Sequence, residues 1–315
     1  MKRIACVGIL VADVMAKGVD GYPAKGELVR IGSVSVHNGG NAMTAAMNLD
    51  RLGTPVSMIG KVGTDLFGDY LADCLDKRGI DVRGLCRDSS VGSSVSIVLL
   101  DPSGERSFLH TVGTNGTFAE SDVDYSIIAE CDAVFLTGIY LMDTLDGDGA
   151  VTFLRRCKEM GKTTFVDVCW DATGRWASVI EPAMPYIDYF MPSIDEAVKI
   201  AGCTDPDRIA DRFNECGARN VVIKMGGKGS YVRLKGEEQG RVFPILSGIT
   251  PVDTTGAGDS FCSGFIASWS RDLPIDDCMR IANTTGAMCV GAMGATSGIR
   301  SFDETLAFLA EHTTK

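Results

Sequence analysis

The 315-residue sequence lacks the local patterns of several common protein classes. Its eleven cysteines contain no C-x-x-C pair, and its three histidines, His37, His110 and His312, are far apart, so a zinc site built from neighbouring residues is not expected. The odd number of cysteines, scattered through apolar runs, favours buried reduced thiols over a disulfide framework. No G-x-G-x-x-G fingerprint follows a predicted strand, which argues against a dinucleotide-dependent redox enzyme.

The sequence is also poor in basic residues and in long apolar runs. Its 30 Lys and Arg against 41 Asp and Glu give a net charge of −11, which opposes general binding to nucleic acid. No stretch reaches the ~18 uncharged apolar residues of a membrane helix. The apolar run 4–12 imitates a signal peptide, but Asp13 ends it and no small-residue cleavage site follows, so we predict a buried strand there. We therefore expect a cytoplasmic protein without nucleic-acid or membrane partners.

The residues that are present predict a single α/β domain over 1–315. Hydrophobic residues make up 45% of the chain and charged residues 23%, as in ordinary globular proteins. Short β-branched runs alternate with helical patterns, which is typical of a doubly wound, mostly parallel central sheet with helices on both faces. Core strands are predicted at 4–9, 56–60, 133–137, 163–168, 189–191 and 221–225. Helices are predicted at about 42–52, 65–78, 122–129, 147–160, 205–216, 257–270 and 275–290.

Two segments interrupt this alternation. One is a strand pattern at 29–36, and the other is a hairpin in which 93–100 turns through Asp101-Pro102-Ser103-Gly104 into 106–111. Strands without crossover helices are expected to form a separate small antiparallel β-sheet, inserted at about 14–36 and 92–113. Since ligands of open α/β sheets bind at the carboxyl ends of the strands, we predict that this small sheet is a lid over that edge.

The glycine-rich segment DTTGAGDSF, from Asp253 to Phe261, opens directly into an apolar helix. Backbone N–H groups at such a turn, together with the positive end of the helix, are suited to binding an oxyanion such as a phosphate. Asp259 lies in the same turn, where its own charge opposes anion binding. Two interpretations are open: Asp259 takes a proton from an incoming hydroxyl, or it caps the helix.

A second glycine pair, Gly39-Gly40, is followed by Asn41 and another predicted helix. Paired glycines let a ligand approach the backbone closely, and Asn41 offers a donor and an acceptor to a polyol. The alternative is an asparagine N-cap after a flexible turn. Asp13, just past the first strand, is either an acceptor for vicinal hydroxyls or a surface turn residue.

Two further segments follow predicted strands. The segment KMGGKGS, from Lys224 to Ser230, is not a Walker A loop because Gly follows Lys228, but a tight hairpin there is compatible with nucleotide contact. Ser193 and Glu196 have the spacing of a capping box at a helix start, and the alternative for Glu196 is a place near a metal ion.

Taken together, these motifs resemble the PfkB family of ribokinase-like carbohydrate kinases over nearly the whole chain. HNGGNAMTAAMNLDRLG at 37–53 is similar to the first family signature, and DTTGAGDSF at 253–261 to the second. DVCWDATGRW at 167–176 and VVIKMGGKGS at 221–230 are similar to further family segments. The resemblance implies ATP-dependent phosphorylation of a hydroxyl of a small sugar or polyol, and a homodimer formed through the lid sheets.

The resemblance also implies roles for individual residues. It makes Asp259 the general base and assigns the anion hole to the amides of Gly256, Ala257 and Gly258. It assigns sugar binding to Asp13, Gly39, Gly40 and Asn41, and the ATP site to Lys224, Gly226, Gly229 and Asn283. It assigns Mg²⁺ to Glu196 through water, and a monovalent cation such as K⁺ to Asp253, Thr255 and Ala292. One position departs from the family pattern: Ser193 stands where the family usually has an asparagine that reaches phosphate.

Three other functions stay open. A nucleoside kinase of the same fold needs aromatic walls for a base, for which Tyr22, Phe108 and Phe118 are available. A kinase of phosphorylated sugars needs a basic residue for the second phosphate, which Arg30 or Arg106 could supply. A sensor that binds sugar without catalysis is the third, and the intact Gly256-Ala257-Gly258-Asp259 segment argues against it.

Overall fold

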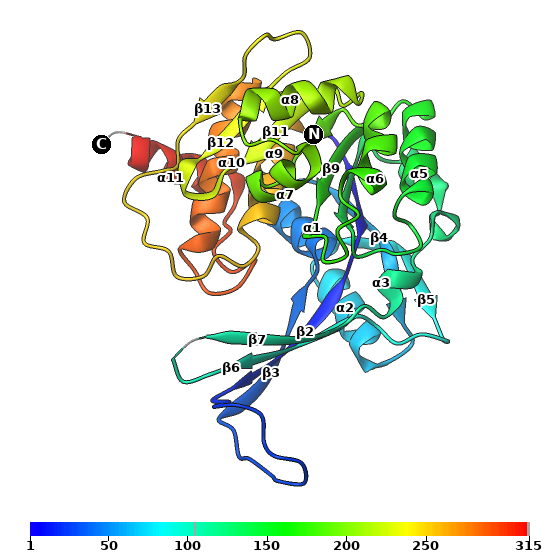
Figure 1. Ribbon diagram of the computed structural model, residues 1–315, viewed down its shortest axis with the longest axis vertical. Helices are drawn as coiled ribbons and strands as arrows, with labels where there is room; N and C mark the ends of the chain where they lie inside the picture. Colours follow the sequence, from blue (N-terminus) through cyan, green and yellow to red (C-terminus); the bar gives the residue numbers. More distant parts are fainter. Residues whose placement is uncertain (104, 314–315) are drawn as a thin grey trace.

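A nine-stranded, mostly parallel sheet forms the body of the protein in a computed structural model that describes residues 1–103 and 105–313 (Figure 1). The strand order is β13-β12-β11-β10-β9-β8-β1-β4-β5. The parallel strands are β1 (Ile4–Gly8), β4 (Val56–Gly63), β5 (Asp81–Asp88), β8 (Ala133–Ile139), β9 (Thr163–Val168), β10 (Tyr189–Phe190) and β11 (Asn220–Lys224). An antiparallel edge is added by β12 (Ser230–Arg233) and β13 (Arg241–Phe243). The predicted core strands are thereby confirmed.

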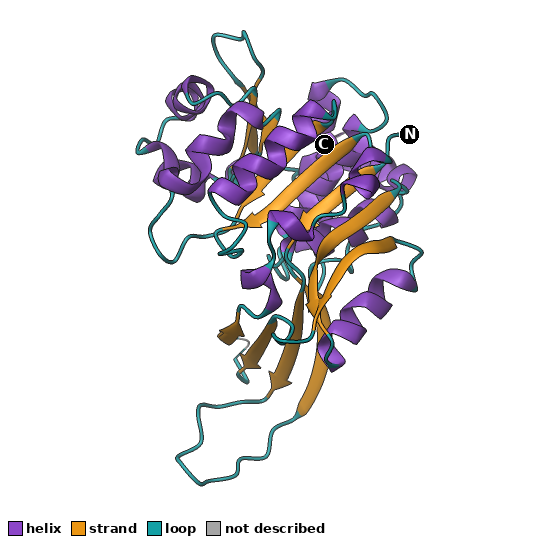
Figure 2. Cartoon of the chain, turned by 90° about the vertical axis from the view of Figure 1, so that its right-hand side faces the viewer, coloured by secondary structure: helices purple, strands orange, loops and turns teal. Residues whose placement is uncertain are grey.

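Helices cover both faces of this sheet, which confirms the doubly wound arrangement (Figure 2). Successive strand residues point to opposite faces, so Ile4 and Cys6 belong to one apolar core and Ala5 and Val7 to the other. The first core is covered by α1 (Asn41–Arg51), α2 (Leu66–Asp76), α9 (Ala257–Trp269) and α10 (Ile275–Val290), with α11 (Phe302–Thr313) at its margin. The second is covered by α4 (Tyr125–Ala129), α5 (Asp148–Glu159), α6 (Ala177–Ile180), α7 (Ile194–Ala201) and α8 (Pro206–Glu215). Short turns of helix are α3 (Thr114–Thr117), η1 (Glu120–Asp122), η2 (Glu181–Tyr186) and η3 (Gly226–Lys228).

A smaller four-stranded sheet, the lid sheet, projects from the body (Figure 1). Its order is β3-β2-β6-β7, with the bounds β2 (Val11–Lys17), β3 (Ser33–Gly39), β6 (Val95–Leu100) and β7 (Arg106–Thr111). The separate sheet is confirmed, with one difference from the expected antiparallel pairing: β2 and β6 run parallel. The reason is that β2 follows β1 and β6 follows β5, and both of these parallel strands deliver the chain to the same edge of the main sheet.

The boundaries of the lid strands differ from the expectation in two places. The strand expected at 29–36 begins at Ser33 and continues to Gly39. β2 was not separated from the first strand, because one apolar run spans the end of β1 and the start of β2. The predicted turn at 101–104 is held by Asp101, which accepts from the backbone and hydroxyl of Ser103, while Gly104 lies outside the described residues. None of the described helices combines the length and the apolar character that a bilayer crossing requires.

Candidate active site

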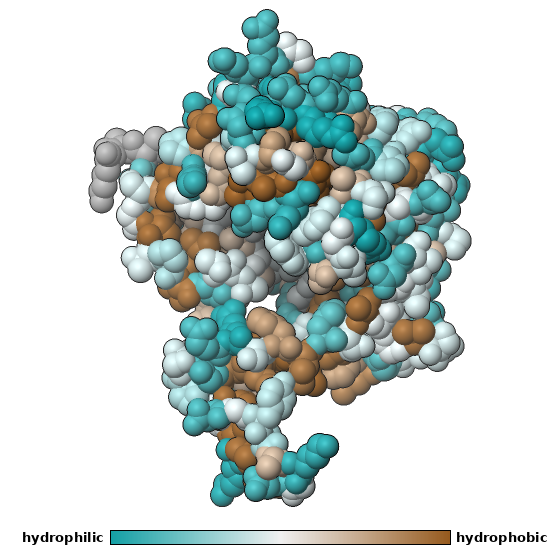
Figure 3. Space-filling model, viewed as in Figure 1, coloured by the Kyte–Doolittle hydropathy of each residue, from teal (hydrophilic) through white to brown (hydrophobic). Residues whose placement is uncertain are grey.

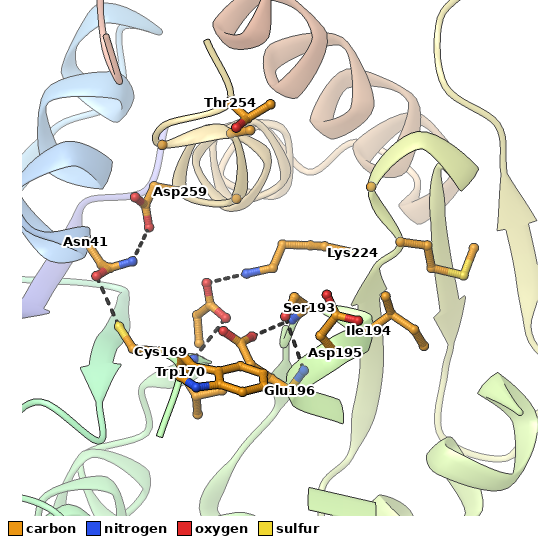
Figure 4. A pocket seen from close by; sticks show the side chains of 17 residues that line it. Asn41, Cys169, Trp170, Ser193, Ile194, Asp195, Glu196, Lys224, Thr254 and Asp259 are labelled. Atoms are coloured by element: carbon orange, nitrogen blue, oxygen red, sulfur yellow. Dashed lines mark hydrogen bonds and ion pairs between the residues drawn. The ribbon is translucent and has the colours of Figure 1, made fainter. Parts of the chain in front are cut away.

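A cavity of about 500 Å³ opens where β9 and β11 end and α1, α7 and α9 begin (Figure 4). Elements far apart in the sequence therefore deliver their ends to one place, as expected at the carboxyl edge of an open α/β sheet. Nine of the residues predicted for the site line this cavity: Asn41, Ser193, Glu196, Lys224, Gly226, Gly256, Ala257, Gly258 and Asp259.

The turn into α9 requires a glycine. Gly256 has φ +73°, and a Cβ at this position would lie 2.4 Å from the Cβ of Ala295. At the helix start, the N–H of Ala257 donates to the carbonyl of Thr254 at 3.2 Å, whereas the N–H of Gly258 has no backbone acceptor among the described residues. The free donors of the first helical turn are therefore available to an anion in the cavity.

The side chain of Asp259 lines the cavity and does not cap its own helix. The N-cap of α9 is Gly256 and makes no side-chain capping bond, and the carboxylate of Asp259 accepts from Nδ2 of Asn41 at 2.8 Å. The other end of the Asn41 amide accepts from the thiol of Cys169 at 3.1 Å, which holds the NH₂ group toward Asp259 (Figure 4). The capping interpretation of Asp259 finds no support in these contacts.

The electrostatics of the cavity raise the pKa of Asp259 toward neutral pH and keep Lys224 charged. Burial raises the pKa of Asp259 to about 7, and repulsion by Asp167 adds to this, while Asn41 and Lys224 oppose it. Asp259 is only 8% exposed. Burial alone would lower the pKa of Lys224, but the ion pair with Asp167 and the charge of Glu196 outweigh it and raise that pKa. A carboxyl that titrates near neutral pH is suited to exchanging protons with a ligand.

Ser193 and Glu196 form the predicted capping box at the start of α7. Oγ of Ser193 accepts from the backbone N–H of Glu196 at 3.3 Å, and Oε2 of Glu196 accepts from the N–H of Ser193 at 2.7 Å. Burial raises the pKa of Glu196, against the attraction of Lys224. Its carboxylate also lines the cavity, and carboxylate oxygens are the ligands that Mg²⁺ prefers. The residues present therefore fit a magnesium ion, and the role of Glu196 toward it stays a prediction.

A second cavity of about 330 Å³ lies on the far side of Gly258 and is lined mainly by apolar side chains. Gly226, Gly229 and Asn283 line it as predicted. Asn283 also supports the loop after β13, because its Nδ2 donates to the carbonyls of Phe243 and Pro244 at 3.1 and 3.0 Å. The apolar wall was not predicted, although the run PILSGITP at 244–251 supplies it: Ile245, Leu246, Ile249 and Pro251.

The remaining residues predicted for sugar binding lie on the lid side and line neither cavity in the described part of the chain. Asp13 on β2 is opposite His37 on β3 and Ser96 on β6. A Cβ at position 39 would lie 2.2 Å from Oδ2 of Asp13, so Gly39 is what allows this carboxylate to lie against β3. Burial raises the pKa of Asp13, against the hydrogen bond from Ser96 and the charge of His37. Gly40 is the N-cap of α1 and so orients Asn41.

The residues predicted for a monovalent cation are arranged differently. Arg106 of β7 forms a two-pronged ion pair with Asp253, with N–O distances of 3.0 and 3.2 Å. Although burial opposes it, this pair and the N–H groups of Thr255 and Gly294 hold the pKa of Asp253 well below its usual range. Ala292 lines a separate cavity of about 280 Å³. The three residues therefore do not offer a free carboxylate to a cation, and the guanidinium of Arg106, considered for a sugar phosphate, is paired with Asp253.

The exposure of three aromatic side chains bears on whether they can form walls for a nucleobase. Phe118, considered as a wall for a nucleobase, is 1% exposed and belongs to an apolar core. Tyr22 and Phe108 are exposed. Among the cavity residues that were assigned no role from the sequence are Asp167, Cys169 and Trp170. The signal was available, because they lie at or just after the carboxyl end of β9, where ligands of such sheets bind.

The chain is similar to known proteins in sequence and in fold. The family model described as "pfkB family carbohydrate kinase" matches residues 1–301. A protein named as an uncharacterized sugar kinase from Archaeoglobus fulgidus is 29% identical over 258 residues, which cover 82% of this chain and 100% of the relative. The structure of Arabidopsis thaliana ribokinase with ribose and ATP has a TM-score of 0.84 at 22% identity and covers 98% of each chain. A ribokinase II candidate from E. coli, solved with ATP and Mg²⁺, has a TM-score of 0.82 at 21% identity and covers 99% of this chain and 100% of its own.

Proposed function

This chain belongs to the pfkB family of carbohydrate kinases, and from that premise we propose that it transfers the γ-phosphate of ATP to a hydroxyl of a small sugar or polyol with Asp259 as the general base. One observation carries the proposal. The Asp259 carboxyl is buried at the start of α9, beside free backbone N–H groups, and takes no part in capping its own helix. A carboxyl in that position is of use for accepting a proton next to a bound phosphate.

In the proposed reaction Asp259 accepts the proton of the sugar hydroxyl. The electron pair of the broken O–H bond forms the new bond to the γ-phosphorus, and the bond from that phosphorus to the bridging oxygen of ATP breaks to release ADP. The pKa of about 7 supports this role, because the carboxylate form is populated at neutral pH and still has useful affinity for a proton. The N–H groups at the start of α9, those of Gly256 and Gly258 among them, then hydrogen-bond the oxygens of the transferring group.

The remaining roles are the binding of ATP, Mg²⁺ and the sugar, and each is assigned to residues of the cavities or of the lid side. The apolar cavity beyond Gly258 is suited to the purine of ATP, with Gly226, Gly229 and Asn283 along it. The ammonium of Lys224 lines both cavities and can contact the phosphates. Mg²⁺ bound with ATP would neutralise phosphate charge, and Glu196 would hold it through water. At the lid side, Asp13 accepts hydrogen bonds from vicinal hydroxyls, and Asn41 at the start of α1 donates to them. Gly39 lets the Asp13 carboxylate lie against β3, and Gly40 lets the chain pass close to Ile9 before Asn41.

The proposal is tested by measuring ADP release in the presence of candidate acceptors. The set comprises ribose, fructose, deoxyribose, inositol, ketogluconates, fructose 6-phosphate and nucleosides. We expect ATP consumption to depend on a small sugar or polyol, and Asp259→Asn to lose it. Preference for a nucleoside or for fructose 6-phosphate would overturn the acceptor class, and sugar binding without ADP release would overturn catalysis. Full turnover by a folded Asp259→Asn variant would remove Asp259 from the mechanism.

We further propose that two copies of the chain associate through their lid sheets. The face of the lid sheet away from Asp13 carries a row of paired apolar residues, Val36, Val14, Ile97 and Leu109, with Val34 next to it. All but Val14 are large exposed hydrophobics, and apolar patches are visible on the projecting sheet (Figure 3). Covering such a face gives a dimer its driving force. Sedimentation should give a dimer that Leu109→Glu converts to a monomer, and a monomeric wild type contradicts the proposal.

A further inference from the structure

Arg106 connects the lid sheet to the turn that leads into the anion hole. It is the first residue of β7, and its two terminal nitrogens donate to the two carboxylate oxygens of Asp253 at 3.2 and 3.0 Å. Nη1 also donates to Oγ1 of Thr255 at 2.8 Å. The side chain of Asp253 is 5% exposed and that of Arg106 is 25% exposed, so the pair is largely shielded from water.

The oxygens of Asp253 have no room for another cation. Oδ1 accepts from Arg106 and from the N–H of Thr255 at 3.0 Å, and Oδ2 accepts from Arg106 and from the N–H of Gly294 at 2.9 Å. Each oxygen thus has two donors, and a positive charge already lies against the carboxylate. The monovalent cation that the family resemblance assigns to Asp253, Thr255 and Ala292 therefore does not fit these residues.

The position of the pair gives it an influence on phosphate binding. Asp253 lies three residues before Gly256, the residue at which the turn into α9 begins. The loop that contains Gly294 continues to Ala295, which packs against Gly256 so closely that a Cβ there would lie 2.4 Å away. By binding Asp253 and Thr255, Arg106 holds the segment that enters the turn, and through Asp253 it also holds the loop behind it.

We propose that the guanidinium of Arg106 takes the place of a dissociable monovalent cation, so that this kinase works without K⁺. The inference rests on the proposed phosphoryl transfer at Asp259, whose anion hole the two loops support. A diffusible ion would order these loops whatever the lid sheet does. A guanidinium carried by β7 orders them only while the lid sheet is in contact with the body, so Arg106 is a positioning residue that couples the two.

The experiment compares ADP release in KCl and in tetramethylammonium chloride at an ionic strength held near ~0.1 M, where exposed charges are screened equally. We expect the wild type to change less than about twofold between the salts. Arg106→Met should lose about ten- to a hundredfold in kcat, the scale of one or two lost charge-assisted hydrogen bonds, and recover in KCl but not in tetramethylammonium. Arg106→Lys should keep activity without K⁺. Arg155→Met is the matched control, because Arg155 is an exposed arginine of α5 that lines neither cavity, and it should behave as the wild type.

Thermal melting in the same salts gives a readout that does not need catalysis. Potassium should raise the melting temperature of Arg106→Met and leave that of the wild type unchanged. Strong stimulation or stabilisation of the wild type by K⁺ would overturn the inference, as would an Arg106→Met variant that folds but does not respond to K⁺. Should the wild type turn over no acceptor in any salt, the proposed function fails, and the melting experiment still decides whether Arg106 excludes the cation.

Discussion

Replacing Asp259 by asparagine is expected to inactivate the protein and to stabilise it at the same time. Burial and the charge of Asp167 raise the pKa of Asp259 from 3.8 to about 7. An acid whose pKa rises on folding binds its proton more tightly in the folded state. The free energy of unfolding therefore falls as the pH rises from about 4 to about 7 and stays level above that. Asparagine keeps an oxygen for the hydrogen bond from Asn41 and carries no charge to desolvate.

The size of the effect follows from the shift in pKa. Three pH units at ~1.4 kcal/mol each give about 4 kcal/mol as the largest gain in stability, reached above about pH 7 and shrinking toward pH 4. The same variant should lose about 10²- to 10⁴-fold in kcat, the usual contribution of a positioned base. Urea unfolding at a series of pH values, together with ADP release, measures the two effects on one protein preparation.

A second buried aspartate provides the control. Against the effect of burial, hydrogen bonds from Thr173 and Trp176 lower the pKa of Asp171, so its charged form is favoured by folding. Asp171→Asn should therefore destabilise the protein at neutral pH, opposite in sign to Asp259→Asn. The reasoning is refuted if a folded Asp259→Asn variant is no more stable than the wild type above pH 7, or if its stability difference does not change with pH.

The geometry makes three further predictions. In the wild type, kcat/KM should fall about tenfold per pH unit below the pKa of Asp259, near 7, because the base form is lost by protonation; a pH–rate profile that stays flat through this range contradicts it. Ser193→Asn should keep the cap of α7 and the activity, whereas Ser193→Ala should lose ~1 kcal/mol of stability in urea unfolding. Lys224→Met should cost ~3–5 kcal/mol, because it leaves the buried carboxylate of Asp167 without its cation, and adding Asp167→Asn should restore part of that loss; equal stability of the two variants would argue against the ion pair.

Features that depend on neighbours in the sequence could be predicted closely. The helix expected at 275–290 is observed as Ile275–Val290, since Pro274 precedes it and an apolar periodicity runs through it. The capping box of Ser193 and Glu196 and the glycine turn into α9 were also predicted, because a cap and a turn are fixed within three or four residues. The signature motifs lie at such positions, so most of the residues that line the cavity could be predicted from the sequence.

Contacts between distant segments could not be predicted in the same way. Asn41 and Asp259 are 218 residues apart, and nothing in the pattern around either residue specifies that their side chains meet. The ion pair of Arg106 with Asp253 depends on where the lid sheet lies, which in turn depends on the parallel pairing of β2 with β6. Asp167 is the second-last residue of a predicted strand, so its place near the carboxyl edge of the sheet could be predicted, but only packing reveals that Lys224 is its partner.

The two cavities have one wall in common, formed by five residues: Lys224, Gly226, Thr254, Ala257 and Gly258. On the proposed function, a single synthetic molecule that joins adenosine to a polyol by a chain of phosphates would occupy both cavities. Its affinity would rise steeply once the tether is long enough to fill both chambers, and would decline again as slack is added. On the proposed function, the distance between the two cavities across these five residues thus sets the tether length of the best bisubstrate inhibitor.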